Sequence, residues 1–392
     1  MKSNYIVFLS ALWVGHAAAM MLPGHELKSY ECDTCESLSH SVLNTSWTID
    51  SKPLGHDTLH HQDSVKYRQE VTLSELKQGV SIYTMAPGAV IRIVPLSRHI
   101  KAFTPEFNIK KGEVDLPLKD ASALWAQDEA LQNSPFINEI LAVQLKPELG
   151  AGEFSLRVKN AGNNLNDRFM IHVLDKASNT ALSLETDKAF YQYGDELVAT
   201  LRLHDNATDY SLDTITISAS TAAGETIPLV TEKVSPGVYK AHFKLDSEKN
   251  PHGKNWYVEA AVTATINEQM IRRHAHTAFS YAIPSAAITE IKAHESQPFS
   301  FTVNVNVATG SRYALQAVLF ATGKKGKKEA IQSVQSAAWL APGQSEMVIS
   351  FPPDVANHYK APYYLGSIQL IDYGQLKTVD TYNKPINISK SG

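Results

Sequence analysis

Apolar and polar residues alternate along most of this chain. From Tyr67 onward, short runs place apolar residues at every second position, as at Phe154, Leu156 and Val158, with polar residues between them. Successive side chains of a β-strand point to opposite faces, so this period predicts strands with one buried face. Glycine, proline and asparagine bound these runs, as turns require. The pattern predicts an all-β protein.

One stretch departs from this alternation. In "LKDASALWAQDEALQN", Asp120 can serve as a helix N-cap, and the residues after it have high helix propensity. We therefore expect one short helix, roughly Ala121 to Gln132, inserted in the first β domain.

The strand-like runs form three blocks. Within each block the runs recur at the spacing of β-sandwiches, with turns such as Pro236-Gly237 between them. We expect three tandem β-sandwich (immunoglobulin-like) domains. Their predicted bounds are 66–178 for an N-terminal β-sandwich domain, 179–283 for an immunoglobulin-like domain and 284–392 for a C-terminal β-sandwich domain.

Residues 1–19 carry the features of a secretory signal peptide. Lys2 supplies a positive start, Ile6 to Val14 form a mostly apolar run, and small residues lead up to Ala19. The apolar run is too short to span a bilayer as a stable helix, and no later stretch reaches the necessary length. We expect cleavage near Ala19, no membrane span and a secreted protein, either periplasmic or extracellular.

Charge and cysteine content narrow the class further. Charged residues make up 19% of the chain and the formal net charge is -4, so no bulk electrostatic attraction to nucleic acid is expected. Two cysteines cannot form a disulfide framework, and apolar cores must supply the stability. Residues 20–65 contain few apolar residues and no regular period, which predicts a flexible, extended leader.

The leader contains both cysteines, Cys32 and Cys35, in a Cys-x-x-Cys pair. The favoured interpretation is a local disulfide, because a secreted protein meets an oxidising environment. Zinc is the alternative cofactor, since His56, His60 and His61 follow and would complete a Cys2His2 ligand set with a His-x3-His spacing. A weaker metal site would use His56, His60 and Asp57 without the cysteines.

The sequence carries no strong catalytic signature. Carboxylates at positions 31, 33 and 36 flank the cysteine pair, and negative neighbours raise a thiol pKa, which argues against a redox centre. No Gly-x-Ser-x-Gly elbow, His-Glu-x-x-His motif or glycine-rich phosphate loop occurs. His274 and His276 would share one face of a strand, but no third metal ligand is identifiable. We name no catalytic residue.

Two segments are candidates for binding. The lysines of "GKKGKKE" could contact phosphates or an acidic membrane surface, or form a solvated hairpin tip. The tyrosines of "HYKAPYYLG" could bind carbohydrate or a partner protein, or face the core. The candidate residues are Lys324, Lys325, Lys327, Lys328, Tyr359, Tyr363 and Tyr364.

Two of the blocks resemble known modules. "TDKAFYQYGDELVATLRLHDN", "SPGVYKAHF" and "YVEAAVTATI" resemble segments of the immunoglobulin-like modules of bacterial exported proteins. "RYALQAVLFATGKKGKKEAIQSVQSAAWLAPGQSEMVISF" is similar to the C-terminal domain of a family of exported bacterial three-domain all-β proteins of unknown function. Some members of that family are type II secretion substrates. The resemblance implies an architecture and an export route, and it implies no chemistry.

These observations favour a secreted binding protein over an enzyme. Tandem sandwiches commonly present loops and edges for recognition. We expect a non-catalytic protein, a possible secreted effector, that recognises a host or envelope protein or a glycan. The alternatives are a secreted hydrolase with a site assembled between domains, and a zinc-holding envelope protein.

Overall fold

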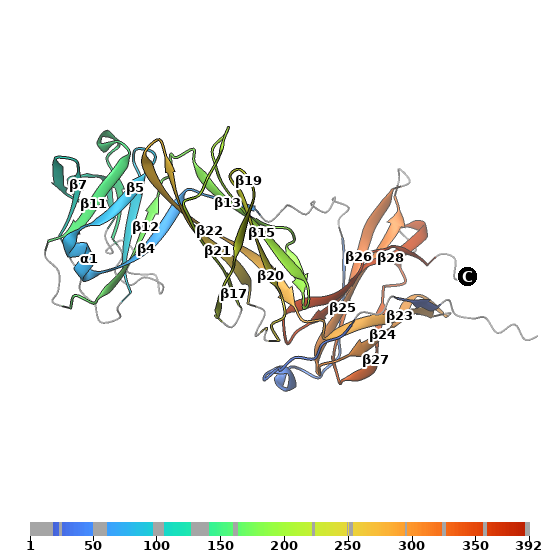
Figure 1. The fold of residues 1–392 in the computed structure, drawn as a ribbon. Helices are drawn as coiled ribbons and strands as arrows, with labels where there is room; N and C mark the ends of the chain where they lie inside the picture. Colours follow the sequence, from blue (N-terminus) through green and yellow to red (C-terminus); the bar gives the residue numbers. More distant parts are fainter. Residues whose placement is uncertain are drawn as a thin grey trace, which may run out of the picture. The chain divides into compact units, whose positions relative to one another are not determined.

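The computed structural model describes residues 19–22, 26–49, 61–96, 106–126, 141–159, 164–221, 224–248, 250, 254–294, 296–323, 327–355 and 359–388. Strands dominate these residues, and they form three pairs of sheets, as the alternation predicted (Figure 1). The chain divides into two compact units. One holds Asp57–Asp246 and Asn255–Ser280; the other holds Met1–His56, Ser247–Lys254 and Tyr281–Gly392.

The N-terminal domain is a sandwich of a five-stranded sheet, in the order β4-β12-β6-β10-β9, on a four-stranded sheet, β5-β11-β7-β8. Phe154, Phe169 and Ile82 are almost fully buried in its core. Its elements are β4 (Lys66–Thr72), α1 (Leu73–Gln78), β5 (Val80–Thr84), β6 (Val90–Pro95), β7 (Phe107–Lys111), β8 (Val114–Pro117), β9 (Ser122–Ala126), β10 (Leu141–Leu145), a 3-10 helix (Pro147–Leu149), β11 (Gly152–Val158) and β12 (Arg168–Leu174).

The first domain contains one short helix, but not at the predicted position. Helix α1 begins after Thr72, whose side chain and that of Glu75 form a capping box. The predicted helical segment is instead strand β9 over Ser122–Ala126, and residues 127–132 lie outside the described residues. Pairing of β9 with β10 satisfies its backbone, so tertiary context overrides helix propensity there.

The central domain packs a six-stranded sheet, β19-β20-β15-β13-β3 with β16 at its edge, on a five-stranded sheet, β14-β22-β21-β17-β18. Trp256, Phe279 and Tyr191 lie together in its core. Its strands are β3 (His61–Ser64), β13 (Ala181–Thr186), β14 (Phe190–Gln192), β15 (Glu196–His204), β16 (Asp209–Tyr210), β17 (Thr214–Ser220), β18 (Thr226–Pro228), β19 (Thr231–Ser235), β20 (Val238–Lys244), β21 (Trp256–Ile266) and β22 (Gln269–Ala282).

A buried ion pair links the N-terminal and central domains. Arg273 on β22 donates from Nη2 to Asp175 Oδ2 at 2.9 Å, and each side chain is only 1% exposed. The same carboxylate accepts backbone N–H groups from Met85 and Ala86. Arg273 also donates to the Thr180 carbonyl. The two charges therefore satisfy each other inside the unit rather than facing water.

The C-terminal domain packs a four-stranded sheet, β1-β23-β24-β27, on a six-stranded sheet, β2-β26-β25-β28-β29 with β30 at its edge. Leu315, Phe301 and Leu370 are among the residues of its core. Its elements are β1 (Ala19–Met21), a 3-10 helix (Cys35–Ser37), β2 (Leu43–Thr48), β23 (Ala286–His294), β24 (Gln297–Val307), β25 (Ser311–Thr322), β26 (Lys328–Leu340), β27 (Gly343–Ser350), β28 (Lys360–Asp372), β29 (Lys377–Tyr382) and β30 (Ile386–Asn387).

The leader corrects the expectation of a flexible segment. Its described residues 20–22 and 26–49 pair with or contact the C-terminal domain, and together with Ala19 we call them the N-terminal strap. The leader also supplies β3, which pairs with β13 of the central domain. Strand β1 pairs with the edge of β23, and β2 pairs with the edge of β26. The side chains of β2 are all exposed, so main-chain hydrogen bonds hold it. A segment that adds strands to existing sheets needs no core of its own, which explains its low apolar content.

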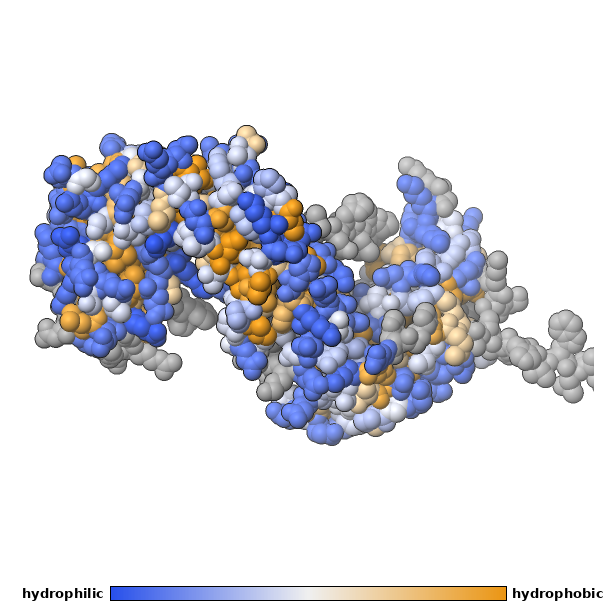
Figure 2. All heavy atoms as spheres, in the orientation of Figure 1, coloured by the Kyte–Doolittle hydropathy of each residue, from blue (hydrophilic) through white to orange (hydrophobic). Residues whose placement is uncertain are grey.

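Hydrophilic side chains cover most of the face seen in Figure 2, with smaller apolar patches among them. Within the described part of the chain, no helix combines the length and the apolar character needed to cross a membrane.

Candidate functional site

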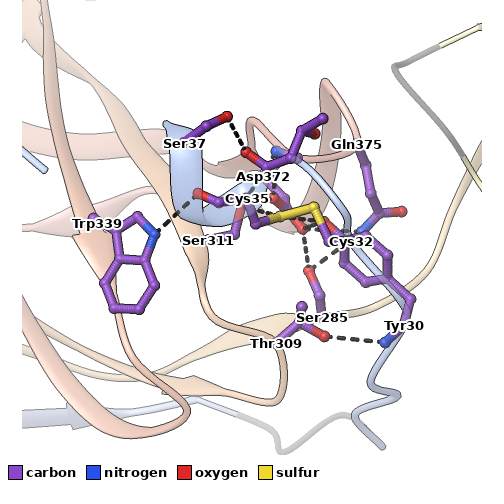
Figure 3. The surroundings of a disulfide bond; sticks show 12 residues. Tyr30, Cys32, Cys35, Ser37, Ser285, Thr309, Ser311, Trp339, Asp372 and Gln375 are labelled. Carbon is purple, nitrogen blue, oxygen red and sulfur yellow. Dashed lines mark hydrogen bonds between the residues drawn. A yellow bond between two sulfur atoms is a disulfide. The ribbon is translucent and has the colours of Figure 1, made fainter. Parts of the chain in front are cut away.

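Cys32 and Cys35 form a disulfide, with an S–S distance of 1.94 Å and a Cα–Cα distance of 5.5 Å (Figure 3). Neither sulfur is therefore a thiolate that could bind zinc or start redox chemistry. His56 and His60 lie outside the described residues, as does the side chain of His61. Among the described residues, no group of three or more His, Cys, Asp or Glu side chains is placed to hold a metal ion.

The disulfide lies in the strap beside a buried carboxylate, Asp372, at the end of β28. Figure 3 shows that residues from the strap, β25 and the loops converge on it. A Cβ at Gly374 would overlap Tyr30 Oη and Cys35 Sγ, so only glycine allows this close approach. The groups that donate to the Asp372 carboxylate are the hydroxyls of Tyr30, Ser285 and Ser311, the Gln375 amide and the Gly374 N–H. This cluster anchors the strap, and its Ser311, Asp372 and Gln375 side chains are fully buried.

Arg312 and Trp339 also hold the strap. Arg312 donates to the carbonyls of Ser39 and Ser41, and His40 stacks on Trp339 with ring centroids 4.6 Å apart. The Trp339 indole N–H donates to the Cys35 carbonyl at 3.2 Å. The strap is thus anchored by side chains between its two strands.

We expect the C-terminal domain to lose stability as the pH rises above about 10. Burial, aided by the charge of Asp372, raises the pKa of Tyr30 and of Tyr313. Unfolded tyrosines ionise near pH 10, roughly their ordinary pKa, while the folded ones stay protonated. Unfolding therefore releases protons above that pH and is favoured there, whereas below it these groups contribute no pH dependence. Denaturant titrations across this range measure the slope, and Tyr30→Phe should reduce it. A stability that stays constant through the tyrosine range would contradict the burial of these hydroxyls.

The lysine and tyrosine segments meet at one end of the six-stranded sheet. Lys328 at the start of β26 places Nζ 4.0 Å from the centroid of the Tyr364 ring on β28. Tyr363 turns inward and packs edge-on against Phe299, with ring centroids 5.2 Å apart. Tyr359 is 38% exposed. Lys327 is also exposed, and Lys324 and Lys325 lie outside the described residues.

A row of glutamines crosses the outer face of the same sheet. Gln335 on β26 pairs in register with Gln316 on β25, and Gln316 pairs with Gln369 on β28. Their neighbours along each strand, such as Leu315 and Leu370, are buried in the core. Because strand side chains alternate between faces, the three amides point away from the core and lie side by side.

Aromatic side chains border this row. Trp47 on β2 is 44% exposed and pairs with Ser333, in the row next to the glutamines. Phe320 pairs across strands with Tyr364. A Cβ on Gly366 would stand 3.2 Å from the Phe320 ring, so the glycine allows that ring to lie over the sheet. We call the surface formed by Trp47, Gln316, Gln335, Gln369, Phe320 and Tyr364 the glutamine face.

Sequence reasoning found one end of this surface and missed the rest. Tyr364 and Lys328 were candidates, whereas Trp47 and the glutamines were not. A signal was present: each glutamine stands between core residues of a strand, as Gln369 does between Ile368 and Leu370. Only the register of three strands shows that these separate positions form a row.

A second polar feature lies on the central domain, outside the glutamine face. It is a hollow of about 210 Å³ over β3, β13 and β15, lined by Asp63, Ser183, Glu185, Thr200, Arg202 and His204. His204 Nε2 lies 3.4 Å from Asp63 Oδ1, and Arg202 Nε lies 3.6 Å from Asp209 Oδ1. Charges of opposite sign thus neutralise each other around it.

The fold and this surface define a three-domain all-β protein with an open polar face. Family models for the N-terminal, central and C-terminal domains of a protein family of unknown function, DUF4785, match residues 34–175, 178–282 and 285–389. The chain belongs to the DUF4785 family, which confirms the resemblance to a three-domain all-β family of unknown function.

Solved structures agree with this assignment. The crystal structure of a DUF4785 family protein from Legionella pneumophila is 42% identical, has a TM-score of 0.81, and the match covers 95% of this chain and 100% of that chain. Trypsin-activated alpha-2-macroglobulin from Escherichia coli is 12% identical, with a TM-score of 0.21, over 76% of this chain and 22% of that chain. A likeness at that level supports no inference. No curated protein matches the chain.

Proposed function

We propose that this protein is an exported, non-catalytic binding protein that recognises a glycan on the glutamine face. The observation that carries the proposal is the row of three amides bordered by aromatic rings on an outer sheet face. Amide groups donate and accept hydrogen bonds, as sugar hydroxyls require, and aromatic rings offer apolar surface to the flat side of a sugar. From β2 to β28 the face spans three strand spacings, roughly 14 Å, which suits an oligosaccharide.

Export is part of the proposal. The features of residues 1–19 favour cleavage after Ala19, which would leave Met20 as the new N-terminus. The remaining strap would still pair with β23 through Met20 and Met21. Mass determination of the protein recovered from outside the producing cytoplasm is expected to give a chain beginning at Met20. A recovered chain that still begins at Met1 would contradict cleavage.

Glycan binding can be tested with the purified mature chain on a panel of oligosaccharides and polysaccharides, by affinity electrophoresis and calorimetry. Trp47→Ala and Gln316→Ala are expected to weaken binding about tenfold each, the equivalent of about 1.4 kcal/mol. Tyr257→Ala is the matched control, because Tyr257 is a similarly exposed aromatic on the central domain. Equal losses for Tyr257→Ala and Trp47→Ala, or the absence of binding to every glycan, would overturn the proposal.

A further inference from the structure

Positive charge is concentrated at one end of the glutamine face. Thr322 at the end of β25 pairs with Lys328 on one side and with Lys360 on the other, so both lysines begin their strands at the same end of the sheet. Lys327 immediately precedes β26 and is exposed. Lys384 precedes Pro385, whose Cα lies 3.7 Å from the position of a Cβ on Gly366.

The neighbouring acidic group points away from this surface. Glu329 pairs with Ala321, which is buried in the core, whereas Lys328 pairs with Thr322 on the other side of the strand. A Cβ on Gly323 would overlap the Glu329 carboxylate, which places that carboxylate against the turn backbone. Glu329 therefore does not neutralise the lysines on the outer face.

The glutamine row and the row beyond it are uncharged. The row that contains Gln335, Gln316 and Gln369 ends in Thr45 on β2 and Thr381 on β29. The row beyond it consists of Leu43, Ala337, Ala314, Ile371 and Thr378. A ligand on the face would meet neutral amides and hydroxyls along the glutamine row, and cations at the end beyond Phe320 and Tyr364.

One of these cations is positioned in advance. The Lys328 ammonium lies over the Tyr364 ring, and Tyr364 pairs with Phe320. The cation–π contact limits the freedom of a side chain that otherwise loses much conformational entropy on binding. An anionic substituent on a sugar stacked against these rings would meet the ammonium directly.

We propose that the ligand of the glutamine face is an acidic polysaccharide whose anionic groups bind at the end marked by Lys328 and Lys360. This inference rests on the proposed function and adds the chemical class of the glycan. Charge complementarity selects the ligand: the chain as a whole carries a formal charge of -4, so a polyanion has no general attraction to it and would be held locally. An acidic membrane fits less well, because the cations occupy one end of the face rather than surrounding it.

Polygalacturonate and its methyl ester test the inference, since they share one sugar backbone and differ in charge. The purified mature chain is expected to bind the acid about tenfold more tightly than the ester, and the difference should shrink between about 50 mM and about 300 mM salt. The Lys328→Gln/Lys360→Gln variant should lose this preference and keep its affinity for the ester. Lys119→Gln/Lys146→Gln removes two exposed lysines of the N-terminal domain and should change neither.

The outcomes separate the two levels of the proposal. Equal binding of acid and ester, or a preference that survives Lys328→Gln/Lys360→Gln, overturns the acidic ligand and leaves glycan binding standing. Binding of neither polymer, nor of any other glycan, overturns both. Binding only to vesicles that contain an anionic phospholipid would also overturn both, and would identify the lysine end as a membrane contact.

Discussion

Replacing Arg273 with methionine is expected to lower the free energy of unfolding of the N-terminal and central domains by about 3–5 kcal/mol, because the change leaves the carboxylate of Asp175 buried without its cation. Two backbone N–H groups, from Met85 and Ala86, would still donate to that carboxylate. They supply partial dipoles rather than a full charge, so they cannot replace the guanidinium. Burial lowers the pKa of Arg273, whereas the charge of Asp175 raises it. The guanidinium is therefore stabilised by the Asp175 carboxylate and not by water.

Denaturant titrations and hydrogen exchange of β22 and β4 measure this effect. Arg202→Met is the matched control, since Arg202 is an exposed arginine of the same unit whose ion pair with Asp209 is open to solvent. It should cost less than about 1 kcal/mol. The variant Arg273→Met/Asp175→Asn removes both charges and is expected to recover part of the loss. If Arg273→Met unfolds at the same denaturant concentration as Arg202→Met, the buried pair is not a structural joint.

Replacing Asp372 with alanine is expected to release the N-terminal strap and to lower the stability of the C-terminal domain by about 3 kcal/mol or more, because several buried donors lose their acceptor together. Tyr30 is the donor that comes from the strap, at 2.9 Å. Ser285 and Ser311 each donate at 2.6 Å from the domain itself. A buried hydroxyl without a hydrogen-bond partner loses its hydration free energy with no compensation. Because the donors come from both the strap and the domain, the substitution destabilises both.

Hydrogen exchange of the β2 amides and limited proteolysis of the strap report its release. Gly374→Ala tests the same contact from the other side, since the added Cβ would displace Tyr30 while the carboxylate remains. Asp354→Ala, a change at an exposed turn carboxylate, should leave both measurements unchanged. Faster exchange confined to β25 and β28, with β2 still protected, would show that Asp372 supports the domain but does not anchor the strap.

The strand content could be predicted because a half-buried strand requires apolar and polar residues to alternate along the sequence. Phe154, Leu156 and Val158 alternate with polar residues, and they form the buried side of β11. Helix α1 could have been found from Thr72 and Glu75, whose spacing is that of a capping box. The segment after Asp120 has stronger helix propensity, yet its first residues form a strand, because pairing with β10 is a non-local interaction that propensity does not report.

The strap and the glutamine face were less predictable for a related reason. Pairing at a sheet edge uses main-chain N–H and C=O groups, which do not depend on the side chain. The side chains of β2 therefore show no pattern from which its partner strand could be predicted. The disulfide could be expected from the Cys-x-x-Cys spacing behind a predicted signal peptide, but its contact with Gly374 could not. Lys328 and Tyr364 are separate binding candidates in the sequence. Their contact depends on the position of β25 between β26 and β28, which no local pattern predicts.

The pairing of the strap with the C-terminal domain also constrains the order in which the chain can fold. Strand β2 pairs Leu43 with Ala337 and Thr48 with Gln332 of β26. The ribosome therefore makes β2 early and its partner strand β26 late. If the chain folds from its N-terminus during synthesis, its first residues therefore stay unpaired until the C-terminal domain has been synthesised. Closing so long a loop is a late and slow event. A nascent chain stalled before β26 would therefore carry two folded sandwiches and an N-terminal segment without its partner strand.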